Sequence, residues 1–219
     1  MDGETLAGLI RGAQRGAPES FDRLVDVFAS RVFGFILRMT GSHQDAEDLM
    51  QEVFLRVVRM IGAYRHDDRF EAWLFRIAAN LVRDRARRAR RAPKLVSAQA
   101  SAEDAGRASS TMDELPGSPA PADARLIRAE EIDALNAAMV SLTDAEREVI
   151  MLRHLGGLSF KEIAGVMGTP LGTALARAHR GLARLRQIMA AEPKSPAAKE
   201  REACSPARLS ETGWRVREA

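Results

Sequence analysis

Apolar residues recur at three- and four-residue spacing in the first ninety positions, a period that matches one face of an α-helix. The pattern predicts helices over Phe21–Thr40, His43–Ile61 and Phe70–Arg91, with Gly41-Ser42 as the boundary between the first two. The positions expected to be buried are Phe21, Leu24, Val25, Phe28, Val32, Phe35, Ile36 and Met39, then Leu49, Val53, Val57 and Met60 or Ile61, then Trp73, Leu74, Ile77, Ala78 and Leu81.

The second half of the chain carries three helix-start signals. In two of them a hydroxyl side chain stands three residues before a carboxylate, as in a capping box, and in the third a threonine precedes a proline. The pairs are Thr143 with Glu146, Ser159 with Glu162, and Thr169 with Pro170. A short helix Ser159–Met167, a turn through Gly168 and a longer helix from Pro170 have the dimensions of a helix-turn-helix. This pattern predicts DNA as a partner.

The composition changes twice along the chain. Residues 92–122 are rich in Ala, Ser, Pro, Gly and acidic residues without apolar periodicity, which predicts a flexible linker. Residues 191–219 are again rich in Pro, Ala and charge, which predicts a disordered tail. The chain then divides into helical domains over residues 1–91 and 123–190, the second starting with a helix at Ala124–Val140. The predicted fold class is all-α, with two small helical domains joined by a flexible linker.

The overall composition agrees with this division. A chain of 219 residues can form two small domains, and 46% hydrophobic, 29% charged and 5% aromatic residues with few β-branched runs favour helices. The formal charge of +3 is too small to indicate a partner. The single cysteine, Cys204, excludes an internal disulfide and suits a reducing cytoplasm. No apolar run approaches the roughly 20 residues of a membrane span, so a cytoplasmic protein without membrane insertion is expected.

The helix predicted over His43–Ile61 has an acidic side. Asp45, Asp48 and Glu52 follow three- and four-residue spacing, and Gln51 borders them. By spacing alone, an ordinary solvated surface is the better interpretation, because exposed acidic faces are common.

The helix predicted over Phe70–Arg91 ends in a basic run. Its members are Arg83, Arg85, Arg87, Arg88, Arg90, Arg91 and the following Lys94, against Asp84. Such a run predicts an electrostatic track for phosphates, although a solvent-exposed helix end is the alternative. Tyr64, Trp73 and Asn80 adjoin it, and aromatic faces and amides can hold unstacked bases, which favours contact with single-stranded DNA. Trp73 itself is more typical of a core residue, because it lies on the apolar stripe.

The presumed recognition helix carries its own polar set. Arg177 and Arg180 lie three residues apart with His179 beside them, and Thr173 is a predicted phosphate contact. The arginines could also be ordinary surface salt-bridging residues, but their place after the turn favours contact with the major groove. Arg180 is expected to face away from the buried residues Ala178, Leu182 and Leu185.

Three phrases of the sequence together resemble the extracytoplasmic-function (ECF) subfamily of bacterial sigma-70 factors. They are Asp45–Phe54, Phe70–Asp84 and Leu158–Arg180, in the family's order. The resemblance implies that residues 1–91 correspond to sigma region 2 and residues 123–190 to region 4. It also implies a sigma factor that binds core RNA polymerase and directs promoter-specific transcription initiation. Region 2 would open the −10 element, and region 4 would dock in the major groove of the −35 element.

The resemblance further assigns individual residues. Core polymerase contact falls on Asp48, Gln51 and Glu52, and a loop at Tyr64–Arg69 would capture a flipped −10 base above Asn80. The expected −10 contacts are Tyr64, Arg65, His66, Asn80, Arg83, Arg87 and Arg88, and the expected −35 contacts are Thr173, Arg177, His179 and Arg180. The chain departs from its relatives at Leu175 and Ala176, where they usually carry a basic residue and a small hydroxyl. Leu175 would either extend the apolar stripe or touch a thymine methyl group.

Core RNA polymerase and promoter DNA are therefore the expected partners, and an anti-sigma factor is a further partner class that no residue identifies. The alternative is a two-domain helix-turn-helix regulator that does not bind polymerase, and a small helical enzyme is more remote. The sequence shows no Gly-rich phosphate loop, nucleophile elbow or paired carboxylates, so no catalytic residues are predicted. The four histidines are scattered, so neither a metal site nor a cofactor is expected.

Overall fold

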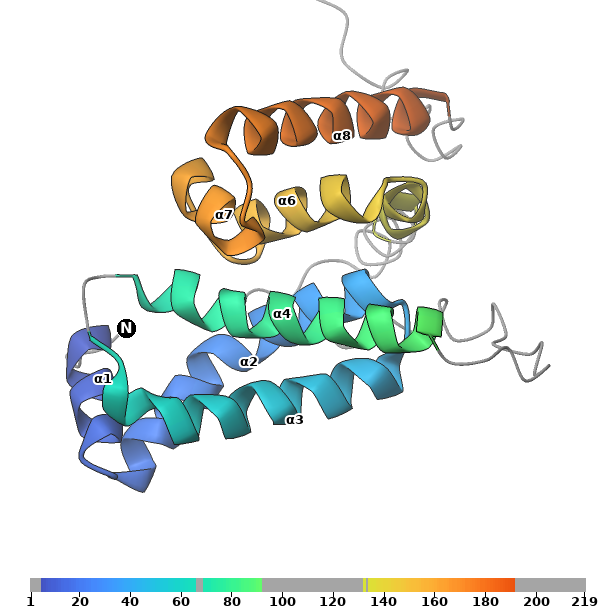
Figure 1. Ribbon diagram of the computed structural model, residues 1–219. Coiled ribbons are helices and arrows are strands. Elements are labelled where there is room, and N and C mark those ends of the chain that lie inside the picture. Colours follow the sequence, from blue (N-terminus) through green and yellow to red (C-terminus); the bar gives the residue numbers. More distant parts are fainter. Residues whose placement is uncertain (1–4, 66–68, 92–131, 133, 192–219) are drawn as a thin grey trace, which may run out of the picture.

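The computed structural model describes residues 5–65, 69–91, 132 and 134–191. All regular elements in these ranges are helices, which confirms the predicted all-α class. Helices α1–α4 form one layer, and α6–α8 form a second layer that lies over α4 in the view of Figure 1. The predicted linker lies outside the described residues, as does the predicted tail apart from Ala191, the last residue of α8.

The first layer is built from four α-helices and a short 3₁₀ turn. These are α1 (Leu6–Gln14), α2 (Pro18–Thr40), α3 (His43–Met60), η1 (Ile61–Ala63) and α4 (Phe70–Arg91). Local signals set most of these bounds: Gly41 ends α2 at φ 71°, and the Ser42 hydroxyl accepts the Asp45 N–H at 3.2 Å. Helix α2 begins at Pro18 rather than Phe21, because proline is favourable in a first helical turn. Helix α1 was not among the predicted elements.

Aromatic side chains join α2 to α4 in the core. Phe35 meets Phe75 edge to face at 5.6 Å between ring centroids, and Phe28 lies 5.4 Å from Phe70. Burying such rings is a large apolar contribution to stability. Most of the residues predicted to be buried are buried, with Ile61 rather than Met60 inside, but five are only half-buried: Phe21, Val25, Met39, Leu49 and Trp73.

The second layer contains the helix-turn-helix. It consists of helical residues 134–140, α6 (Asp144–His154), α7 (Phe160–Met167) and α8 (Leu171–Ala191). Both predicted capping boxes are confirmed, since Thr143 and Ser159 each exchange hydrogen bonds with the carboxylate residue three positions on. Gly168 ends α7 with φ 62°, the left-handed conformation that glycine adopts without steric cost.

The predicted start of α8 is wrong by one residue. The carbonyl of Pro170 accepts the N–H groups of Thr173 and Ala174 at 3.0 and 3.1 Å, so Pro170 stands at the N-cap position and Leu171 begins the helix. The hydroxyl of Thr169 is buried without a hydrogen-bond partner and does not cap α8.

The two layers are held together by α2 against α6 and by α4 against α7. Arg31 of α2 donates to the carbonyls of Leu155 and Gly156 at 2.7 and 2.8 Å, which satisfies acceptors at the C-terminal end of α6. The same guanidinium lies 5.5 and 5.8 Å from the rings of Phe28 and Phe75. The first layer therefore supplies a cation that caps a helix of the second.

Candidate nucleic-acid interface

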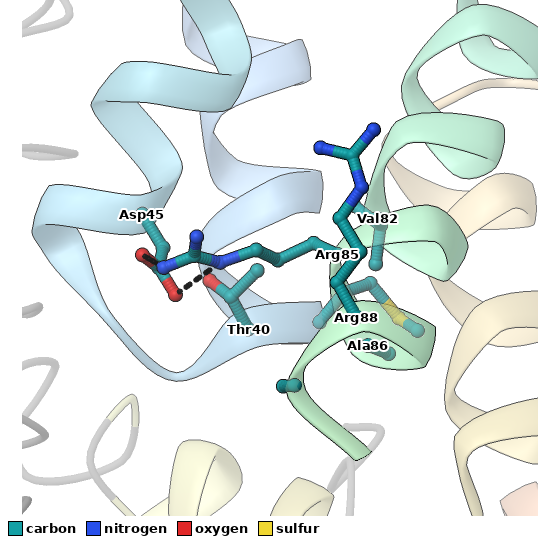
Figure 2. Close-up of a pocket in the computed structure, with 8 residues that line it drawn as sticks. Thr40, Asp45, Val82, Arg85, Ala86 and Arg88 are labelled. Atoms are coloured by element: carbon teal, nitrogen blue, oxygen red, sulfur yellow. Dashed lines mark hydrogen bonds and ion pairs between the residues drawn. The ribbon is translucent and has the colours of Figure 1, made fainter. Parts of the chain in front are cut away.

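The acidic side of α3 is exposed but narrower than the sequence suggested. Asp48 and Gln51 are exposed, and half-buried Glu52 accepts the Nε of Arg56 at 2.8 Å. Asp45 is not available on this side, because it is ion-paired with Arg85 of α4, as Figure 2 shows. The usable face therefore consists of Asp48, Gln51 and Glu52.

Two apolar residues extend this face, and the sequence analysis assigned a function to neither of them. Leu55 and Val58 are 51% and 52% exposed, one and two turns after Gln51. Both residues lie outside the buried stripe of Val53 and Val57, and this position is the signal by which the sequence could have identified them as exposed. An exposed face that combines carboxylates with large apolar side chains is suited to binding another protein.

Helix α4 has one open edge beside the second layer. Asn80 is exposed there, and its Oδ1 accepts a hydrogen bond from Arg83 Nη1 at 3.0 Å. Arg83 also donates to Glu148 of α6 and to the Val166 carbonyl of α7, the latter at 3.2 Å. Because Glu148 is only 6% exposed, this ion pair belongs to the contact between the layers.

The basic end of α4 is largely exposed. Arg87 pairs with Asp84 one turn before it, whereas Arg88 lines a pocket of about 470 Å³ between the end of α2, the start of α3 and α4. Figure 2 shows the Arg88 side chain directed away from the Arg85–Asp45 pair. Arg87 and Arg88 therefore retain the accessibility that a phosphate contact requires.

The loop before α4 starts from a fixed aromatic cluster. The ring of Tyr64 lies 4.8 Å from that of Trp73 and 5.6 Å from that of Phe70. Arg65 is exposed, and His66 lies outside the described residues. The structure thus brings Tyr64 to the start of α4, one side of which carries Asn80.

The polar residues of α8 differ in accessibility. Thr173 and Arg177 are half-buried, whereas His179 and Arg180 are exposed. Arg180 is not free of partners, because its Nε lies 3.6 Å from Glu146 Oε1 at the start of α6. Its side chain is nevertheless 62% exposed, so part of the guanidinium remains open to solvent.

The residues buried on the apolar side of α8 differ from the prediction at one position. Leu182 is 37% exposed rather than buried, while Gly181 is buried. A Cβ on Gly181 would lie 2.8 Å from Ile150 Cδ1, so this glycine allows α8 to approach α6 closely. Leu175 is exposed together with Leu171, which favours its groove-facing alternative over the buried stripe.

The two capping boxes also change the pKa of the carboxylate that each contains. The side-chain hydrogen bond from Thr143 lowers the pKa of Glu146, and that from Ser159 lowers the pKa of Glu162. In both cases burial opposes the shift, and the charge of Arg69 adds to it for Glu162. In both residues the pKa is lower in the folded state than the ordinary value of 4.5. Each carboxylate therefore stabilises the fold at pH values above 4.5, and this stabilisation is lost as the pH falls through the lower, folded-state pKa.

Thr143→Ala is therefore expected to lower the free energy of unfolding by about 1 kcal/mol at pH 7, because it removes an N-cap and a bond to Glu146. The deficit relative to the wild type should shrink as the pH falls below 4.5 and Glu146 becomes protonated in both proteins. Urea unfolding at a series of pH values measures this difference. A deficit that stays constant with pH would show that the carboxylate of Glu146 does not contribute.

The described residues contain neither a helix that could span a membrane nor a group of at least three potential metal ligands.

The comparisons with known proteins cover both layers. Residues 24–92 match the family described as Sigma-70 region 2, and residues 132–185 match Sigma-70, region 4. The RNA polymerase sigma factor CarQ of Myxococcus xanthus is 39% identical over 175 residues, which cover 80% of this chain and 91% of the relative. The ECF RNA polymerase sigma factor SigW of Bacillus subtilis is 32% identical over 180 residues, covering 81% and 93% of the two chains.

Solved structures share the fold. CnrH in complex with the cytosolic domain of CnrY superposes with a TM-score of 0.58 at 24% identity, covering 84% of this chain and 97% of that one. The sigma factor RpoE from Bartonella quintana, in complex with the anti-sigma factor NepR, also gives 0.58, at 20% identity over 80% and 99% of the two chains. On the strength of the two matched regions and these relatives, the chain belongs to the sigma-70 family, as an ECF-type RNA polymerase sigma factor.

Proposed function

We propose a division of labour in which α3 binds core polymerase, the open edge of α4 acts on the −10 element and α8 reads the −35 element. As a sigma factor the chain is a non-enzymatic initiation factor that directs polymerase to promoters. The observation that carries the proposal is the exposed amide of Asn80 on α4, beside Arg83 at the border with the second layer. Promoter-dependent run-off transcription with core polymerase, with and without the chain, tests the function as a whole.

The polymerase contact is assigned to Asp48, Gln51 and Glu52. These residues occupy an exposed face of a rigid helix and are continued by exposed apolar side chains, the combination that protein interfaces use. A helix-turn-helix regulator that does not bind polymerase would have no use for this face. Co-purification of the chain with core polymerase distinguishes the two functions.

The −10 contacts are assigned to Tyr64, Arg65, His66, Asn80, Arg83, Arg87 and Arg88, and the −35 contacts to Thr173, Arg177, His179 and Arg180. The amide of Asn80 can read a base edge, and the exposed arginines can follow the phosphates. On α8, the exposed His179 and Arg180 offer polar groups to the major groove, and half-buried Thr173 suits a phosphate contact.

An anti-sigma factor is proposed as a further partner, since RpoE of Bartonella quintana is described in complex with one. The proposed place of action is the bacterial cytoplasm, where polymerase and promoter DNA are found.

The packing of the two layers limits one of these contacts. The charge of Arg83 is partly neutralised by Glu148, so a DNA phosphate must compete with a buried carboxylate for the same guanidinium. Glu148→Gln keeps the size of the side chain and removes its charge. We expect this variant to bind single-stranded −10 DNA about three- to tenfold more tightly, because a charge-assisted hydrogen bond opposing the DNA is weakened.

The affinity of the free chain for a labelled single-stranded oligonucleotide, measured by fluorescence anisotropy at fixed salt, tests this expectation. Asp144→Asn is the matched control, because Asp144 pairs with Arg90 where both side chains are well exposed, and such pairs contribute little. An unchanged affinity in Glu148→Gln would show that the buried pair does not restrict Arg83.

A further inference from the structure

The side chain of Gln14 hydrogen-bonds helix α1 to the segment that leads into the −10 loop. Gln14, the last residue of α1, donates from Nε2 to the carbonyl of Ile61 at 3.1 Å and to the carbonyl of Tyr64 at 2.6 Å. Both partners are acceptors only, so the amide orientation with its NH₂ group toward them is the one that chemistry permits. The two N–H groups of one amide thereby fix both ends of η1.

The Gln14 side chain is attached to a rigid support. Leu9, Ile10 and Ala13 of α1 are buried in the core, and α1 packs along both α2 and η1. Gly12 lies so close to α2 that an added Cβ would fall 2.1 Å from the Ser20 hydroxyl oxygen. The buried residues and this close approach fix the place of α1 beside α2, and with it the position of the Gln14 amide.

Tyr64 is held from two sides as a result. Its carbonyl accepts from Gln14, its N–H donates to Ile61 at 3.1 Å, and its ring packs on Trp73 and Phe70 of α4. The backbone of Tyr64 is already extended, with φ −68° and ψ 127°, so the direction in which the chain leaves toward Arg65 is set at this residue. A contact that orients the start of a recognition loop contributes to which base the loop accepts.

We propose that Gln14 is a positioning residue for −10 recognition: its amide clamps Ile61 and Tyr64, so that Tyr64 and Arg65 are presented to the −10 element in one orientation. This inference rests on the proposed −10 role of Tyr64 and Arg65 and adds a residue to it. Gln14 lies before residue 24, where the match to Sigma-70 region 2 begins. Helix α1 is thereby given a part in promoter choice as well as in packing.

The test compares three substitutions of Gln14. Gln14→Met keeps an unbranched side chain of similar length without donors, Gln14→Glu sets a carboxylate against two carbonyls, and Gln14→Lys keeps N–H donors on a flexible stem. Gln187→Met is the matched control, because Gln187 is exposed near the end of α8, in the other layer. The template is a promoter obtained by mapping the transcription starts that appear when the wild-type chain is overproduced, together with versions carrying each single-base change in its −10 element.

The readout is the selectivity of open-complex formation by the reconstituted holoenzyme, measured by permanganate reactivity as a ratio of the mapped promoter to its −10 variants. Gln14→Met and Gln14→Glu should lower this ratio about tenfold, which corresponds to about 1.4 kcal/mol and to the net contribution of one or two hydrogen bonds. Gln14→Lys should retain most of the selectivity, and Gln187→Met all of it. Binding of core polymerase, which uses α3, should be unchanged in all four variants.

A general loss of fold is separated from a loss of positioning by two comparisons. If Gln14→Met reduced opening on every template equally while the ratio stayed as in the wild type, or if Gln14→Lys lost as much selectivity as Gln14→Glu, Gln14 would be a packing residue only and the proposal would be overturned. If Arg65→Ala and Asn80→Ala in the wild-type background also left the ratio unchanged, the proposed −10 role of the loop and α4 would itself fail.

Discussion

Asp48→Arg combined with Glu52→Arg is expected to abolish binding to core RNA polymerase while leaving the helical fold intact. Both side chains are accessible on α3, so the substitutions bury no new charge, but they reverse two charges at the centre of the proposed interface. Opposing like charges across an interface costs several kcal/mol, which corresponds to at least about a hundredfold loss of affinity. The salt bridge from Glu52 to Arg56 is lost as well, but a half-exposed pair of this kind contributes little to stability.

A pull-down with core polymerase measures the binding, and circular dichroism confirms that the variant is folded. Asp144→Arg is the matched control: it reverses an exposed acidic charge on α6, in the other layer, where Asp144 pairs with the well-exposed Arg90. Wild-type affinity in the double variant would mean that the acidic face is merely solvated. Equal losses in Asp144→Arg would mean that net charge, rather than this face, governs binding.

Arg180→Ala is expected to weaken binding of the holoenzyme to the −35 element by about 1–3 kcal/mol if the guanidinium contacts a guanine. Leu175 and Ala176 provide no hydrogen-bonding side chain, so Arg177, His179 and Arg180 must supply the direct contacts to base edges. Arg180 reaches toward Glu146 in the free chain, and release from that carboxylate is part of the cost of binding DNA.

Affinities for duplexes with the mapped −35 sequence and with a scrambled one, measured at one salt concentration, separate two roles. A loss confined to the mapped duplex supports base contact, whereas equal losses on both duplexes would show that Arg180 only holds phosphate. Glu146→Gln provides the complementary variant, because it should release Arg180 and strengthen binding. Weaker binding in Glu146→Gln would indicate that Glu146 is needed to orient the guanidinium.

Much of the fold follows from signals that lie within a few residues of each other. The reciprocal bonds of Thr143 with Glu146 and of Ser159 with Glu162 are local, and so is the left-handed turn at Gly168, so the sequence alone predicts these helix ends. The same holds for the Phe70–Arg91 helix, whose predicted bounds the structure reproduces. The family resemblance was equally accessible, because it depends on short phrases in a fixed order and is confirmed by the matched regions.

The partners of the charged residues could not be predicted in this way. Asp45 shares a helix side with Asp48, yet it is held by Arg85, forty positions later in the chain, and Arg83 is held by Glu148 of the other layer. A helical period shows which face of a helix is buried, but not which distant side chain will meet a residue at its edge. The accessible part of the candidate site therefore depends on how the helices pack.

Tertiary packing also explains where the apolar periodicity predicted burial incorrectly. Helix α4 is covered by the first layer and by α7, so residues beyond a single stripe, such as Phe75 and Ala79, are buried. On α8 the buried side is shifted toward Gly181, because only a residue without a Cβ allows the close approach to Ile150, and Leu182 is left partly exposed. The sequence by itself determined the helices, their caps and the family. The tertiary structure alone decided which charges are neutralised, which faces remain open and that Gln14 reaches Tyr64, because these contacts join residues whose separation in the chain carries no local signal.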